Sequence, residues 1–307
     1  MRALVGLIAI TVGCYTSATP APPPTVPVVT RPERAIAISD PLGFLPDDSS
    51  VVVVVDLKEL KQSAAWSTLA PRLQQRIPAD VSQYFASCGF DPLSVKRVSI
   101  GLRDLDGPNR NGVIVIRGYR RDQLMACIEK ANAAAPGTMT IENGVVTTPA
   151  DGSKLVFTFA DDTTLVIQIG PEANQASLLA SIDSGAPLRV NPRFTEHLTR
   201  LESNDPLWFV FDDAKMLGAA AMGMQMRLVM GSARIADGVS AQIRIRFPDP
   251  TIAASTATTL QAQTTAAAMF FDELVVSADE TDVVVRVVMS DAKLSSAISL
   301  IVGSLGP

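Results

Sequence analysis

A run of five consecutive valines, Val51–Val55, constrains the fold more than any other stretch of this chain. β-Branched residues favour extended backbone, and an apolar run without polar alternation is typical of a strand buried on both faces. Asp56 follows directly, and Leu57, Leu60 and Ala64 then have helical spacing. We therefore expect a buried strand that passes into a helix, with the Asp56 carboxylate as the helix N-cap rather than as a catalytic group.

The same pattern occurs a second time. The apolar residues 207–211 precede Asp213-Ala-Lys-x-Leu217, which matches Asp56-Leu-Lys-x-Leu60. A second match relates Ala160–Ile169 to Ala278–Val287. We therefore predict an α+β fold made of two related β-α-β-β-α-β-β-α units, with antiparallel sheets and helices packed on one face.

Composition argues against several classes of function. The chain is 47% apolar and 19% charged, its formal net charge is −5, and no basic cluster of the kind that binds nucleic acid stands out. It contains one histidine and three cysteines, and it lacks phosphate-loop, dinucleotide and nucleophile-elbow motifs. We expect no metal, no cofactor, no nucleic-acid partner and no enzymatic activity.

The N-terminus has the features of an export signal. Met1-Arg2 precedes an apolar run of about ten residues, Ala3–Val12, which is too short to span a bilayer as a helix. The run ends in Thr11-Val-Gly-Cys14, which resembles a bacterial lipoprotein signal in which the cysteine is lipidated, although Thr11 stands where leucine is usual. The alternative is an ordinary secretory signal cleaved near Ala18, which would remove Cys14.

A proline-rich stretch follows Cys14 and cannot build a core. At about 3.1 Å per residue such a spacer reaches roughly 70 Å, enough to hold a folded body clear of a membrane. Tyr15 rather than aspartate follows Cys14, and by resemblance to Gram-negative sorting signals this implies the outer membrane, with the body facing the periplasm or the cell surface.

The predicted organisation therefore has four parts. Residues 1–14 form a lipoprotein-type signal peptide with Cys14 as the lipid acceptor, and residues 15–41 form a disordered tether. Residues 42–186 form the first α+β unit and residues 187–307 form the second.

Two cysteines remain once Cys14 is assigned to lipid. An exported protein reaches an oxidising compartment, so we predict a structural disulfide between Cys88 and Cys127. Closing a loop of about 40 residues would contribute about 3–4 kcal/mol on the chain-entropy model. A catalytic redox pair is the alternative, but the two cysteines lack the Cys-x-x-Cys spacing typical of such pairs.

One region resembles a family of uncharacterised secreted or lipid-anchored proteins of the myxobacterial type. The matching features are Leu45-Pro46, the Val-Asp-Leu end of the valine strand, Ser63-x-x-Trp66 and Cys88-Gly-Phe-Asp-Pro92, followed by a cysteine in the next helix. The resemblance implies a shared fold and the disulfide, and it brings no known activity.

These features predict an outer-membrane-anchored lipoprotein that binds or scaffolds an envelope component. Its partners would be the membrane, through the N-terminal lipid, and an envelope protein. One alternative is a periplasmic carrier of a small apolar ligand, held near Met222, Met224 and Met226. A less favoured alternative is an envelope hydrolase that uses Asp212 and Asp213, but adjacent strand residues point to opposite faces and cannot form a facing acid–base pair.

Overall fold

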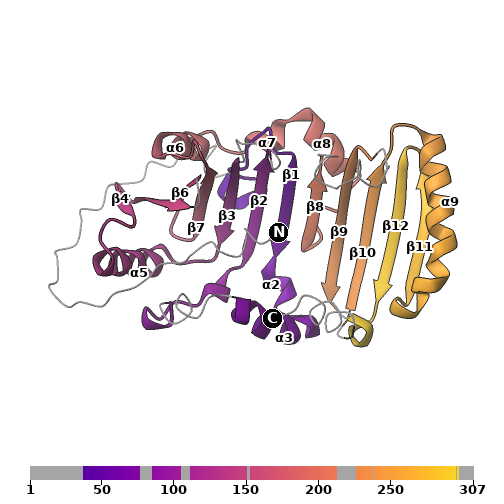
Figure 1. Ribbon diagram of the computed structural model, residues 1–307, viewed down its shortest axis with the longest axis horizontal. Helices are drawn as coiled ribbons and strands as arrows, with labels where there is room; N and C mark the ends of the chain where they lie inside the picture. The colour runs from indigo at the N-terminus through magenta and orange to yellow at the C-terminus, as the bar shows by residue number, and fades with distance from the viewer. Residues whose placement is uncertain are drawn as a thin grey trace.

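A computed structural model describes residues 37–76, 85–104, 111–150, 153–212, 226–236, 238–294 and 296. Its centre is one antiparallel sheet of twelve strands, in the order β11-β12-β10-β9-β8-β1-β2-β3-β7-β6-β5-β4 (Figure 1). The strands are β1 (Val51–Asp56), β2 (Arg97–Arg103), β3 (Asn111–Arg117), β4 (Thr140–Glu142), β5 (Val145–Ala150), β6 (Ser153–Phe159), β7 (Thr164–Gly170), β8 (Leu207–Phe211), β9 (Leu228–Ala236), β10 (Gly238–Arg246), β11 (Glu273–Asp279) and β12 (Asp282–Met289).

The helices connect the strands and cover parts of both faces of the sheet. They are α2 (Leu57–Leu60), α3 (Ala64–Arg76), α5 (Arg121–Ala134), α6 (Gln175–Asp183), α7 (Pro187–Val190), α8 (Pro192–Thr199) and α9 (Pro250–Ala267), with short 3-10 turns η2 (Pro92–Ser94) and η3 (Ala268–Phe270). In Figure 1, α5 lies toward one end of the sheet and α9 lies at the other.

The valine strand β1 lies in the interior of the sheet. Val53 is opposite Ile100 of β2 on one side and opposite Phe209 of β8 on the other. Val52 and Val54 are almost fully buried on one face, and Val51 is buried on the other. The prediction of a strand buried on both faces is confirmed for the face of Val52 and Val54, whereas on the other face Val51 is buried and Val53 and Val55 are only half-buried.

The prediction of two α+β units, each with its own sheet, is wrong. The β1–β8 ladder joins the two parts into one continuous sheet across the predicted boundary at residues 186 and 187. The physical reason is that β1 has two long edges, and both need a hydrogen-bonding partner once its side chains are buried. β2 pairs with one edge and β8 with the other, so no break separates the parts.

The helical spacing of Met216, Ala220, Met224 and Leu228 in the sequence predicts a helix that reaches Leu228, and this prediction is wrong at that end. Leu228 is the first residue of β9, which pairs with β8 and with β10. Met226 and Leu228 are both buried, so the apolar pattern there belongs to the sheet and its core rather than to a helix face.

The prediction that the helices cover a single face is wrong as well. Leu178 of α6, Leu188 of α7 and Phe194 of α8 pack on the face that carries Val52 and Val54. α5 packs on the opposite face, beside Ile114 and Ile167, and the strand register places α9 on that same opposite face, beside Val276 and Val283. Since side chains alternate across a strand and both sets are apolar here, both faces need cover.

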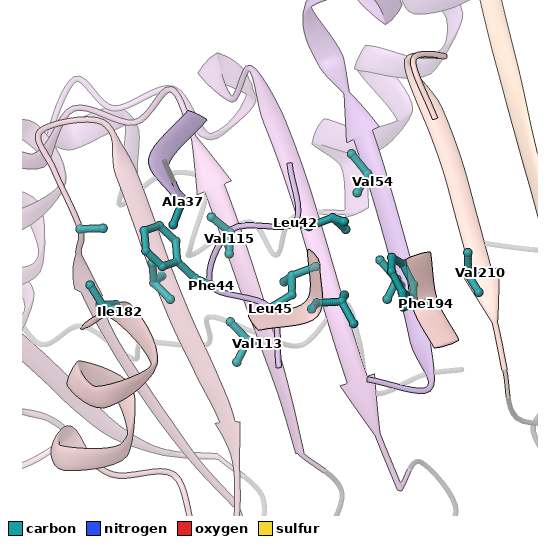
Figure 2. Close-up of a cluster of buried hydrophobic side chains, with 14 of the residues drawn as sticks. Ala37, Leu42, Phe44, Leu45, Val54, Val113, Val115, Ile182, Phe194 and Val210 are labelled. Atoms are coloured by element: carbon teal, nitrogen blue, oxygen red, sulfur yellow. The ribbon is translucent and has the colours of Figure 1, made fainter. Parts of the chain in front are cut away.

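The segment from Ala37 to Leu45 is part of the core. Leu42, Phe44 and Leu45 have no exposed surface and lie against Val113 and Val115 of β3 (Figure 2). Burying each of these three side chains contributes about 1.5–3 kcal/mol relative to leaving it in water. The folded body therefore includes residues from Ala37 onward, although the sequence predicts tether as far as residue 41.

Asn143-Gly144 stands between two strand-like stretches, which predicts a hairpin turn at this position, and the structure confirms it. Both residues have positive φ, 50° and 77°, as the favoured two-residue turn between β4 and β5 requires. Glycine meets this requirement without strain, and asparagine tolerates it better than most residues.

Candidate functional site

A cluster of charged side chains lies where α8 approaches β10 and β12. Its centre is the carboxylate of Asp282, which has no exposed surface. Arg246 Nε donates to Asp282 Oδ1 at 2.9 Å, and Arg200 and Arg244 place guanidinium nitrogens 3.5 and 3.7 Å from Asp282 Oδ2. A buried carboxylate is costly unless it is paired, and these three arginines pair with it.

Further carboxylates surround the same arginines. Glu196 lies 3.6 Å from Arg246, Glu280 lies 3.2 Å from Arg200, and Asp279 lies 2.7 Å from Arg244. The hydrogen bond with Asp282 raises the pKa of Arg246, and the hydrogen bond from Arg244 lowers the pKa of Asp279. These ion pairs join α8 to the strands, so the cluster is a structural contact rather than a source of reactive groups.

His197 is the residue in this region that comes nearest to a catalytic group. Its Nε2 lies 3.5 Å from Asp212 Oδ2, and Arg193 binds that same carboxylate oxygen at 2.6 Å. The ring is buried, and neither ring nitrogen has a hydrogen-bond partner in the described part of the chain. A histidine that activates a nucleophile must contact its hydroxyl or thiol, and among the described residues His197 has no such contact.

The burial of His197 differs from the surface position that its neighbour Glu196 suggests. His197 shares the inward face of α8 with Phe194, three residues earlier, and the two rings lie 6.5 Å apart. Residues three apart on a helix face the same side, so both side chains are carried toward the sheet.

Asp56 and Asp212, the described carboxylates at the ends of the two strands, are both engaged. Asp56 accepts a hydrogen bond from the Lys58 backbone amide at 2.9 Å and pairs with Arg97 at 2.6 Å. The prediction that Asp56 caps the following helix is confirmed. Asp213, the second carboxylate of the hydrolase alternative, lies outside the described residues, and Asp212 is held by Arg193.

The predicted disulfide is present. Cys88 and Cys127 are joined across a sequence separation of 39, and Cys127 is buried on the inner face of α5. An open cavity of about 400 Å³ adjoins the bond. Its lining consists of the two cysteines with Asp122, Gln123, Ala126 and Lys130. Asp122 is itself paired with Arg120, so the charged lining is partly engaged already.

The predicted methionine site is only partly described. Met226 is buried in a cluster with Phe247, Ala257 and Val276, which makes it a core residue. Met222 and Met224 lie outside the described residues, as does Cys14.

Arg117 is a half-buried cation that the sequence analysis did not identify. Its Nε donates to the carbonyl of Ile38 at 2.8 Å, and its Nη2 donates to the carbonyls of Ala37 and Asp40 at 3.1 and 2.6 Å. Burial lowers the pKa of Arg117 to about 10, which leaves it charged at neutral pH. The sequence feature that could have indicated this contact is an arginine at the end of the apolar stretch Val113–Ile116.

Asp40 adds a second set of contacts that hold residues 37–42 to the folded body. Its carboxylate forms an ion pair with Arg189 at 2.6 Å and accepts a hydrogen bond from the Leu42 amide. Burial alone would raise the pKa of Asp40, but the hydrogen bonds from Arg189 and Leu42 hold it below its usual value. We call the contacts of Arg117, Asp40 and Arg189 with residues 37–42 the N-terminal clamp.

The described residues contain no group of three or more histidine, cysteine or acidic side chains arranged to hold a metal ion. Among the helices of the described ranges, none is long and apolar enough to cross a membrane.

Comparison with known proteins shows the fold. No family model and no curated protein sequence matches the chain. Crystal form III of TP0453 is similar, with a TM-score of 0.53 and 9% sequence identity over 85% of this chain and 98% of that one. Crystal form IV of TP0453 gives a TM-score of 0.53 at 10% identity, over 85% of this chain and 96% of that one. At such low identity the likeness concerns the arrangement of the backbone alone.

Proposed function

We propose that this protein is a lipoprotein anchored to the outer membrane through Cys14, whose sheet-rich body is a non-enzymatic binding or scaffolding module in the cell envelope. The observation that carries the proposal is the order of segments at the N-terminus. A short apolar run ends at Gly13-Cys14, a proline-rich stretch follows, and the chain then enters the core at Ala37.

The N-terminal clamp supports an anchoring role for this end of the chain. A tether can hold a folded body only where it is fixed to that body. Arg117 bonds three carbonyls within residues 37–40, and the apolar side chains that follow are fully buried. A firm attachment at this point is what an anchor needs, whereas a cleaved secretory leader needs none.

The state of the ionisable groups supports binding over catalysis. Asp282, Asp212, Asp56 and Asp40 each form ion pairs with arginine. Groups committed to structural pairs in this way are poorly placed to exchange protons with a substrate.

The test of anchoring is metabolic labelling with a fatty-acid probe in a Gram-negative host. We expect label on the wild-type chain, with the protein in the outer-membrane fraction, and loss of both in Cys14→Ser. The matched control is the double variant Cys88→Ala/Cys127→Ala, which removes the other two cysteines and should keep the label. An unlabelled wild-type protein in the soluble periplasmic fraction would refute the anchoring.

A further inference from the structure

The two cysteines of the disulfide differ in their exposure to solvent. Cys127 is 2% exposed on the inner face of α5, whereas Cys88 is only half-buried, in the turn before η2. The open cavity of about 400 Å³ adjoins the bond. A thiolate that breaks a disulfide must reach one of its two sulfur atoms, so access decides which sulfur is attacked. Cys88 is the more accessible of the two.

The wall of this cavity places a cation near the bond. Gln123, Ala126 and Lys130 of α5 line the cavity and are exposed. Lys130 follows Cys127 by three residues, which places both on the same side of the helix, and Lys130 has no ion-pair partner among the described residues. A nearby ammonium group stabilises a thiolate. Lys130 therefore favours both the arrival of an attacking thiolate and the departure of the Cys127 sulfur as a thiolate.

The segment that carries Cys88 is also held by contacts that do not involve the bond. Phe85 and Phe90 are buried with their ring centroids 5.0 Å apart, and the ring of Phe90 lies 4.8 Å from that of Tyr119. The Tyr119 hydroxyl donates to the carbonyl of Pro92 at 2.7 Å. Buried aromatic rings contribute strongly to a core. These contacts remain when the bond is broken, so reduction is compatible with a folded protein.

We propose that the Cys88–Cys127 disulfide is a site of thiol–disulfide exchange in the folded protein, at which a dithiol attacks Cys88 from the cavity. The first thiolate of the dithiol bonds to Cys88 Sγ, the Cys88–Cys127 bond breaks, and its electron pair goes to Cys127 Sγ, which takes up a proton. The second thiolate then attacks the dithiol sulfur of the mixed disulfide, and Cys88 leaves as a thiolate and takes up a proton. The protein gains two electrons and two protons, and the dithiol becomes a disulfide.

The exchange would change the attachment of residues 85–90 to α5. With the bond intact, Cys88 ties this segment covalently to the helix. With the bond reduced, only the aromatic contacts and the hydrogen bond of Tyr119 hold it, so the segment opens locally more often. The proposal goes beyond the binding role proposed above, and it does not depend on whether Cys14 carries lipid.

The test follows reduction of the full chain with Cys14→Ser, in which Cys88 and Cys127 are the remaining cysteines. Dithiothreitol or reduced thioredoxin is added, and the free thiols are alkylated at intervals and located by mass spectrometry. We expect the rate to rise in proportion to the dithiothreitol concentration and to stay constant in urea below the unfolding transition, because the attack needs no prior unfolding. Reduction by either dithiol supports the site, and a faster reaction with thioredoxin at equal dithiol concentration identifies a protein as the favoured reductant.

Two pairs of variants test the route through the cavity. Ala126→Trp fills the cavity from its exposed wall and should slow reduction about tenfold, because it blocks access to the bond. The matched control, Ala133→Trp, changes an exposed residue of the same helix outside the described cavity lining and should leave the rate unchanged. Lys130→Ala should slow reduction about threefold, because the thiolates lose a nearby cation. Lys58→Ala, at an exposed lysine of α2, should have no effect.

Variants with a single cysteine test which sulfur is attacked. In the same chain, Cys127→Ser keeps the Cys88 thiol and Cys88→Ser keeps the Cys127 thiol. Oxidised glutathione should modify Cys88 about tenfold faster than Cys127, because Cys88 is more accessible. Faster modification of Cys127, an unchanged rate in Ala126→Trp, or a reduction rate that levels off with dithiothreitol and rises with urea would each overturn the proposal. The reduction kinetics use the intact disulfide, so they decide the question even if the single-cysteine variants do not fold.

Discussion

Replacing Arg117 by methionine would remove the polar part of the N-terminal clamp while keeping a long apolar side chain on β3. Three carbonyl oxygens would lose the guanidinium donor, and that of Asp40 would keep the hydrogen bond from the Gly43 amide at 2.9 Å. That of Ala37 belongs to a fully buried residue, so water cannot replace the guanidinium there. Ile38 and Asp40 are only partly covered, and water can reach their carbonyls more readily.

The expected loss follows from these differences in burial. A buried acceptor left without a partner costs about 1–3 kcal/mol, and the two partly exposed carbonyls together add roughly 1 kcal/mol. We expect Arg117→Met to lower the free energy of unfolding by about 2–4 kcal/mol. Arg117→Lys should fall between methionine and wild type, because one ammonium keeps the charge but lacks the fork that spans three carbonyls.

The assay is urea unfolding of the full chain followed by circular dichroism, with hydrogen exchange at residues 37–45 as a local readout. The matched control is Arg103→Met, which removes a half-exposed ion pair with Asp48 and should change stability by no more than about 1 kcal/mol. If Arg117→Met changed stability no more than Arg103→Met, the argument that the guanidinium holds the N-terminal segment would be refuted.

Three further predictions concern other features. Asp282→Asn should lower the free energy of unfolding by about 3–5 kcal/mol, measured by urea titration, because it leaves arginines around a buried site without their counter-charge. Cys88→Ala/Cys127→Ala should cost about 3–4 kcal/mol by the same method, and reduction of the wild type should reproduce that loss; no change on reduction would contradict it. Tyr119 donates its hydroxyl proton to the carbonyl of Pro92 at 2.7 Å, and burial raises its pKa above the ordinary 10.0. The folded state therefore keeps a proton that the unfolded state loses above pH 10, so stability falls as pH rises from 10 to 12. Tyr119→Phe should flatten that fall, and an unchanged slope in unfolding titrations across this range would refute the assignment.

Local sequence patterns predicted the parts of the fold that depend on neighbouring residues. The valine strand, the Asp56 cap and the Asn143-Gly144 turn each follow from the backbone preferences of a few adjacent residues. The pairing of Cys88 with Cys127 followed from counting the cysteines that remain once Cys14 is assigned to a lipid.

The joining of β1 to β8 could not be predicted in the same way. This ladder pairs Val51 with Phe211, residues 160 positions apart, and no local pattern specifies which strand meets which edge. The similarity between the two parts of the chain suggested two separate units. In separate units, however, β1 and β8 would each have an unpaired edge, and in the structure these two edges pair with each other. The start of β9 at Leu228 was missed because its apolar residues continue a pattern with helical spacing.

The charged clusters around Arg117 and Asp282 could not be predicted either, because they also depend on long-range contacts. Arg117 and Asp282 are ordinary charged residues in the sequence, and only long-range contacts cover Arg117 in part and bury Asp282 fully. The partners of Asp282 come from the C-cap of α8 and from β10, and those of Arg117 come from a segment about 80 residues earlier. Burial of a charge is a property of the assembled fold, so it leaves no trace in local periodicity.

The position of the N-terminal clamp also determines how the body would respond to mechanical force. Any load that arrives through the residues before Ala37 enters the molecule at Arg117 of β3, which has β2 on one side and β7 on the other. Force applied to an end strand can open a sheet one hydrogen bond at a time, like a zipper. Force delivered to an inner strand is shared by the ladders on both sides, so many hydrogen bonds resist it together.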